Sequence, residues 1–245
     1  MSKIDTLVVC GDSFQDTGLV GHEGTHWSEI VSSRLNLNLM NLAISGGSSV
    51  AVAFQMLYAE NIPNCLVVGS MAASEMRYEL SSQTDAIEKL NYRHFAFKST
   101  KNPLNAKRDP FIQLIRSMPV SMMEEGLQSQ ILTNFNFNIK RQTDLWSILY
   151  ALRTLHHKKI PVLFFQALPN GGPIPMEDFA PFVDESCIIK AEELDIYSGF
   201  FDHSKMSLRE MEELDPGYHT THERQVEIAD YMTVRIKNLI DGHTQ

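Results

Sequence analysis

Three residues of this 245-residue chain have the types that nucleophilic catalysis by a hydroxyl group requires. Ser13 is the candidate nucleophile, His219 the candidate base, and Asp215 the carboxylate that would orient the base. A serine hydroxyl is a weak nucleophile alone, so it needs a base within hydrogen-bond reach and a third group that holds this base. We expect the backbone amides of Ser13 and Gly46 to donate to an oxyanion, because glycine lets an intermediate approach the backbone closely. This chemistry needs no metal and no cofactor, and we expect neither.

The candidate residues lie at boundaries between predicted elements. An apolar run such as Thr6–Cys10 is typical of a buried strand. The segments concerned are 11–13 after the strand 6–10, 45–47 after a strand 37–44, 69–70 after a strand 66–68, and 215–219 before a helix that begins at about 221. Ligands of parallel sheets bind beyond the carboxyl ends of the strands. We therefore expect all of these segments, including Ser70, to meet at one edge of a sheet.

Strands alternate with helices along most of the chain, which indicates a parallel sheet covered on both faces. Helical spacing of apolar residues predicts helices from Trp27, over 50–58 and over 145–155, and a further buried strand is predicted at 160–166. The polar stretch 81–143 interrupts this rhythm and has only weak amphipathic segments, such as Phe111 to Met118. We interpret residues 1–245 as a single domain with a mainly helical insertion at 81–143, which covers the substrate cleft or serves as an oligomer contact.

Composition excludes several classes of function. Asp and Glu number 30 against 21 Lys and Arg, for a formal charge of −9, so neither nucleic acid nor an anionic membrane surface is an expected partner. No segment has the roughly 18 apolar residues of a membrane-spanning helix, and the N-terminus lacks signal-peptide features. Cys10, Cys65 and Cys187 have neither metal-site nor disulfide-framework spacing. The sequence therefore predicts a protein of the cytoplasm.

Several blocks of the sequence resemble those of the SGNH/GDSL hydrolases. Residues 11–18, GDSFQDTG, are similar to the first block of that family, and 41–46, NLAISG, are similar to the second. Residues 215–219, DPGYH, stand in the place of the C-terminal block. The resemblance covers the first 80 residues and the last 35. It implies a flavodoxin-like three-layer α/β/α sandwich and an esterase, lipase or carbohydrate deacylase, whose substrate is a small-molecule or carbohydrate acyl ester. It also implies Ser13, His219 and Asp215 as the triad.

The chain departs from the family pattern at two places. The third block usually reads Gly-x-Asn-Asp, with an Asn side chain that donates to the oxyanion, but Met71 stands where this Asn is expected. Loss of one such donor typically costs about 10²–10³ in rate. Ser70, Ser74 and Arg77 are alternative donors. Asp215 and His219 are four residues apart rather than the usual three. Altered third blocks of this kind are similar to those of divergent bacteriophage members.

Other interpretations of these residues remain open. The main alternative function is a catalytically weakened SGNH-like binding or structural protein, for example a virion component, and Met71 favours it. His222 is a rival base, which we interpret instead as a solvated residue of the first helical turn. Asp202-His203 is a rival acid–base pair without a strand-end setting. We interpret Cys10 as an inert core thiol, and Trp27 and Trp146 as packing residues on apolar helix faces.

Overall fold

A computed structural model of the chain describes its α/β core. The described residues are 3–12, 15–17, 25–44, 47–71, 77–80, 116–119, 126, 129, 136–166, 187–189 and 222–243.

The described core contains a five-stranded parallel sheet with the order β2-β1-β3-β6-β7. Its strands are β1 (Thr6–Cys10), β2 (Asn38–Asn41), β3 (Cys65–Met71), β6 (Val162–Gln166) and β7 (Ile188–Ile189). The chain passes from β1 to β2 on one side and then crosses to β3 on the other side of β1. This order is the flavodoxin-like one, whose switch point lies between β1 and β3. The predicted fold class is confirmed.

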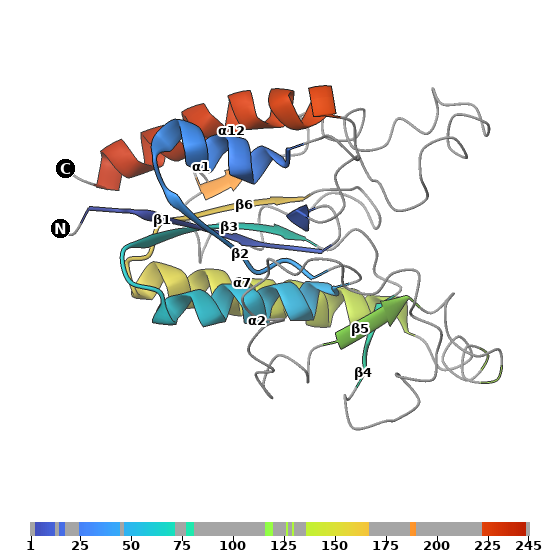
Figure 1. Ribbon diagram of the computed structural model, residues 1–245. Helices are drawn as coiled ribbons and strands as arrows, with labels where there is room; N and C mark the ends of the chain where they lie inside the picture. Colours follow the sequence, from blue (N-terminus) through green and yellow to red (C-terminus); the bar gives the residue numbers. More distant parts are fainter. Residues whose placement is uncertain are drawn as a thin grey trace.

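Helices cover both faces of the sheet and complete the three layers (Figure 1). Helices α1 (Trp27–Leu35) and α12 (His222–His243) pack together on one face, and α2 (Ser49–Tyr58) and α7 (Phe137–His157) pack together on the other. A 3-10 turn, η2 (Ala59–Asn61), follows α2.

The two cores follow from the alternation of side chains along each strand. Leu7 and Val9 of β1 are buried among the residues under α1 and α12, whereas Val8 and Cys10 are buried among those under α2 and α7. A strand that is buried on both faces must be apolar throughout, which is why Thr6–Cys10 reads as a continuous run. The helices and strands predicted in the described core are present, most with ends shifted by a few residues and α7 with a start several residues earlier than predicted.

Side chains cap the two helices that begin at the carboxyl ends of β1 and β2. The Oγ of Ser48 accepts a hydrogen bond from the Ala51 amide at 3.1 Å and so satisfies a free donor in the first turn of α2. His26 and Glu29 form a reciprocal capping box at the start of α1. Both helix starts are fixed by local sequence next to the sheet edge where the candidate residues were expected.

The described part of the predicted insertion is helical at 126, 129 and 137–143, as expected, but one segment of it is a strand. Strand β5 (Arg116–Pro119) overlaps the weakly amphipathic stretch 111–118 and pairs antiparallel with β4 (Arg77–Leu80) in a separate two-stranded sheet. Pairing with β4 gives the backbone of β5 the partners that a helix would otherwise have supplied. Helix α7 also begins earlier than predicted, at Phe137.

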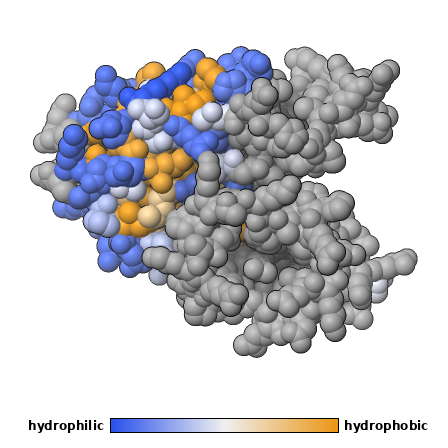
Figure 2. Space-filling model, viewed as in Figure 1, coloured by the Kyte–Doolittle hydropathy of each residue, from blue (hydrophilic) through white to orange (hydrophobic). Residues whose placement is uncertain are grey.

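Hydrophobic and hydrophilic residues are interspersed on the described part of the surface in the view of Figure 2. Among the described helices, none combines the length and the apolar character that crossing a membrane would need.

Candidate functional site

The carboxyl ends of β1, β2 and β3 form one edge of the sheet, called here the carboxyl edge. Cys10 pairs with Gly69, so Gly11 leaves β1 beside Ser70 of β3. This position, between β1 and β3, is the switch point of the sheet order and the usual ligand position in such folds.

Gly11 is the most tightly enclosed residue of the carboxyl edge. Its amide donates to Gln55 Oε1 at 2.7 Å, and its carbonyl accepts from Gln55 Nε2 at 3.1 Å. A β-carbon at Gly11 would lie 2.2 Å from Gln15 Cγ and 2.7 Å from Ser70 Oγ. Only glycine fits, because the loop after β1 folds back against β3 at this point.

The loop between β2 and α2 packs against the same residues. Its Ile44 amide donates to the Gly11 carbonyl at 3.1 Å, and the Gly47 amide donates to the Ile44 carbonyl at 2.8 Å. A β-carbon at Gly47 would lie 2.9 Å from the Ile44 oxygen and 3.8 Å from Asp12 Cα. The loops after β1 and β2 are therefore in contact, as the sequence predicted.

Asn41 ties the end of β2 to the loop after β1. Its Nδ2 donates to the Gln15 carbonyl at 2.6 Å, and its Oδ1 accepts from the Ala43 amide at 2.9 Å. The Gln15 amide donates to the Asp12 carbonyl at 3.1 Å. Gln15 is therefore held by both Asp12 and Asn41, and Ser13 lies outside the described residues.

Trp27 connects this loop with the start of α12. Its indole Nε1 donates to Gln15 Oε1 at 2.9 Å, and its backbone amide donates to Gln225 Oε1 at 2.7 Å. Nearby, the Thr25 amide donates to His222 Nδ1 at 3.4 Å. The beginning of α12 is thus bound to the beginning of α1, which is bound to the loop after β1.

Three buried polar atoms near these contacts are unsatisfied. Within the described part of the chain, Gln15 Nε2, Ser70 Oγ and Gln225 Nε2 have no hydrogen-bond partner, and all three residues are 0% exposed. Each such atom costs about 1–3 kcal/mol of desolvation. Groups of this kind call for an explanation, and one explanation is a ligand that pairs with them.

The predicted site residues divide into two groups. Ser13, Gly46, Asp215 and His219 lie outside the described residues, as do Ser74, Asp202 and His203. Ser70 is described and lies against Gly11 at the carboxyl edge. Met71 is the last residue of β3, and its backbone pairs with Gln166 of β6.

Some of the alternative interpretations concern described residues. His222 is an exposed residue of the first turn of α12, as expected, and Trp27 is fully buried. The packing interpretation is wrong for Trp146, whose side chain is largely exposed on α7. Burial raises the pKa of the Cys10 thiol well above its ordinary value and raises that of Cys65 to about 11. Both thiols stay protonated near neutral pH, so Cys10 is not a thiolate nucleophile.

Sequence reasoning missed Gln15, Gln55 and Gln225, which make the main side-chain contacts described above. For Gln55 the sequence held a signal, because a single polar residue interrupts the apolar helix 49–58 and its buried position demands a partner. Gln15 and Gln225 lie in polar surroundings in the sequence and gave no comparable signal.

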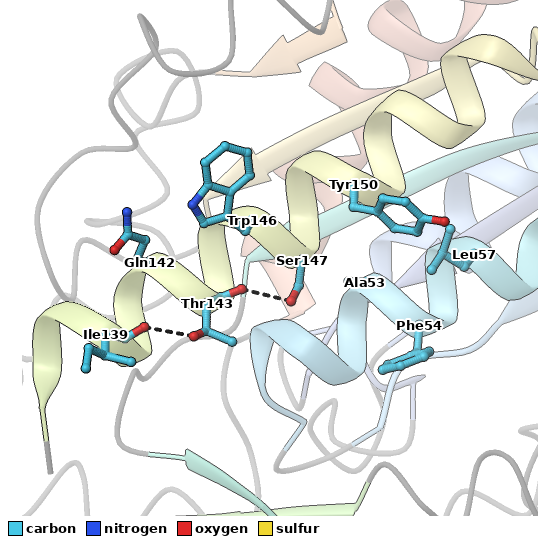
Figure 3. Close-up of a pocket in the computed structure, with 9 residues that line it drawn as sticks. All are labelled: Ala53, Phe54, Leu57, Ile139, Gln142, Thr143, Trp146, Ser147 and Tyr150. Atoms are coloured by element: carbon cyan, nitrogen blue, oxygen red, sulfur yellow. Dashed lines mark hydrogen bonds between the residues drawn. The ribbon is translucent and has the colours of Figure 1, made fainter.

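Away from the carboxyl edge, a groove lies between α2 and α7 (Figure 3). It has a volume of about 570 Å³ and is lined by Ala53, Phe54, Leu57, Ile139, Gln142, Thr143, Trp146, Ser147 and Tyr150. The exposed fractions of Trp146 and Tyr150 are 59% and 64%, and Figure 3 shows Tyr150 pointing toward Leu57. No Asp, Glu, His, Lys or Arg is among these described lining residues, so the groove offers apolar contact rather than acid–base chemistry.

Solved structures with a similar fold include an esterase. The structure of the psychrotrophic esterase EstA from Pseudoalteromonas sp., inhibited by monoethylphosphonate, matches 97% of this chain and 99% of its own chain, with 13% sequence identity and a TM-score of 0.49. No protein-family model matches this chain, and neither does any curated protein.

Proposed function

We propose that this chain is a serine hydrolase that cleaves a small acyl ester, of the esterase or O-deacetylase type, through Ser13, His219 and Asp215. The observation that carries the proposal is the pair of hydrogen bonds made by Trp27. One of them binds Gln15, two residues after Ser13, and the other binds Gln225, six residues after His219. Gln15 and Gln225, which lie close in sequence to the proposed nucleophile and base, are therefore both bound to Trp27, one by its indole and the other by its backbone amide.

Chain connectivity supports the approach of base and nucleophile. His219 precedes His222, the first residue of α12, by three positions. Since a chain spans at most about 3.3–3.6 Å per residue, His219 is within about 11 Å of His222. His222 contacts Thr25, next to the α1 start that holds the Ser13 loop. A base on this segment is thus within reach of the loop after β1.

The proposed reaction has two steps. Ser13 Oγ attacks the carbonyl carbon of the ester while His219 accepts the hydroxyl proton, and the tetrahedral intermediate then expels the alcohol, which takes that proton. Water next attacks the acyl-enzyme and gives a proton to His219, and the acid leaves as Ser13 regains its hydrogen. Asp215 orients the imidazole and stabilises its protonated form throughout. Water is the only co-reactant.

Oxyanion stabilisation in this proposal comes from amides at the carboxyl edge. The donors are the backbone amides of Ser13 and Gly46, with the hydroxyl of Ser70 in place of the Asn that Met71 replaces. The buried and unpaired Ser70 Oγ beside Gly11 supports this role.

Hydrolysis of a short-chain aryl acetate, with labelling by a fluorophosphonate, tests the proposal. We expect wild type to turn over and label, and Ser13→Ala to do neither. Ser33→Ala, which removes an exposed hydroxyl from α1, is the matched control and should behave as wild type. If folded wild-type protein neither labels nor exceeds the rate of Ser13→Ala, the proposed function is wrong.

A second candidate function is a binding or structural protein, for example a virion component. The observation that favours it is the apolar groove between α2 and α7, where Ile139, Trp146 and Tyr150 are all more than half exposed. Under this candidate, Ser13→Ala leaves partner binding unchanged, whereas Trp146→Ala weakens it.

A further inference from the structure

Gln15 holds its side-chain amide in a fixed orientation. An indole Nε1–H can only donate, so the Gln15 atom that faces Trp27 at 2.9 Å must be the oxygen. The amino group Nε2 is thereby directed away from the indole. It is fully buried and has no partner among the described residues. Gln15 therefore offers two hydrogen-bond donors that the described fold does not use.

The Gln15 side chain lies close to Ser70 Oγ, another unpaired polar atom among the described residues of the carboxyl edge. The Gln15 side chain and Ser70 Oγ approach the same point, the place where a β-carbon on Gly11 would stand, at 2.2 Å and 2.7 Å. Gln15 is also only two residues from Ser13. The Gln15 side chain, with its unpaired amide, and the unpaired Ser70 hydroxyl thus lie against the same glycine, where the strand that precedes the proposed nucleophile ends.

We propose that Gln15 is a catalytic residue whose Nε2–H binds the substrate carbonyl oxygen as it becomes negatively charged. This inference rests on the proposed hydrolase function and goes beyond it, since it moves the missing side-chain amide donor from β3 to the loop after β1. Met71 cannot donate a hydrogen bond, whereas Gln15 offers the same chemical group as the expected Asn. Trp27 is a positioning residue, because its indole keeps the Gln15 amide from rotating.

Gln225 provides a matched comparison within the same protein. It too is fully buried, accepts a hydrogen bond from Trp27, and has an unpaired Nε2 among the described residues. It differs in two respects: its Oε1 binds the Trp27 backbone rather than the indole, and it is not among the nearest neighbours of a β-carbon at Gly11. The two glutamines therefore separate the effect of a buried amide from the effect of its position.

Steady-state kinetics of Gln15→Met and Gln225→Met test the assignment. For Gln15→Met we expect kcat to fall about 10²–10³-fold with KM within threefold, because an oxyanion donor acts in the transition state. Both variants should lose similar thermal stability, whereas kcat should fall at least tenfold further in Gln15→Met than in Gln225→Met, because Gln225 supports the segment next to His219 without touching the oxyanion. A Gln15→Met protein with wild-type kcat, or equal losses of kcat in both variants, would overturn the proposal.

A binding experiment keeps the test independent of turnover. In the Ser13→Ala protein, methylphosphonate is a tetrahedral anion that mimics the intermediate without reacting. We expect its addition to shift the side-chain amide resonances of Gln15 in NMR spectra and to leave those of Gln225 in place. Unshifted Gln15 resonances at saturating anion overturn the donor role. Failure of wild type to hydrolyse any ester while this shift occurs overturns the proposed function instead.

Discussion

Substitution of Gly11 by alanine tests the packing on which the carboxyl edge depends. The added β-carbon would lie 2.2 Å from Gln15 Cγ, 2.7 Å from Gln15 Cβ and 2.7 Å from Ser70 Oγ. Real carbon atoms do not approach so closely, so the loop after β1 must move. Movement of Gln15 also breaks its hydrogen bond to Trp27.

The cost follows from these two effects. Overpacking of a tightly packed interior costs about 1–3 kcal/mol. The lost hydrogen bond costs about 0.5–1.5 kcal/mol more. We therefore expect Gly11→Ala to lower the free energy of unfolding by about 2–4 kcal/mol. For a domain of this size, that corresponds to a fall in Tm of about 5–15 °C.

Urea unfolding followed by circular dichroism measures the loss. Gly242→Ala is the matched control, because its β-carbon would meet nothing within 4 Å and alanine is favoured over glycine in a helix by up to about 1 kcal/mol. The control should be as stable as wild type or slightly more stable. A Gly11→Ala protein within about 0.5 kcal/mol of wild type would refute the described contact of Gln15 and Ser70 with Gly11, since this is the size of an ordinary surface substitution.

Further predictions concern the second anchor of Gly11 and the cysteines. Gln55→Met removes both hydrogen bonds to Gly11 and leaves the buried Gly11 amide without this partner. We therefore expect the free energy of unfolding, measured with urea, to fall by about 2–4 kcal/mol; an unchanged midpoint would contradict the pairing. In native protein at pH 8 we expect a thiol reagent to modify the partly exposed Cys187 but not the buried Cys10 and Cys65, and all three in denaturant; rapid native modification of Cys65 would count against its burial. Because burial raises the pKa of Cys65 to about 11 while the unfolded thiol ionises near 9.0, the free energy of unfolding should fall as pH rises from about 9 toward 11. The variant Cys10→Ala/Cys65→Ala should show a smaller fall in the same pH series.

The fold followed from the sequence because its central strands are buried on both faces. Thr6–Cys10 and 66–68 are continuous apolar runs, and only a parallel sheet under two layers of helices buries such strands fully. Strand β7 could not be predicted, since two isoleucines give no periodicity. The β4–β5 pair could not be predicted either, because the partner strands are far apart in sequence and short.

The site was predictable in its position and less so in its supports. The rule that ligands bind at carboxyl ends of parallel strands predicted Gly11 and Ser70 at one edge of the sheet, and the pairing of β1 with β3 makes them neighbours there. Gln15 and Gln225 could not be predicted, because their roles depend on Trp27, which lies 12 and 198 residues away from them. A hydrogen bond between distant side chains leaves no local pattern in the sequence.

The placement of donors explains how a third block without Asn remains compatible with hydrolysis. In the family pattern, one donor comes from the loop after β3, so the geometry of that loop must be maintained. Under our proposal the side-chain donors are Gln15 and Ser70, and both lie against Gly11. Trp27 then gains importance, because its indole sets the orientation of Gln15 while its backbone amide binds Gln225 at the start of α12. If the proposal holds, oxyanion binding is concentrated around the loop after β1, and the fold supports the described residues of that loop through Gln55, Asn41 and Trp27.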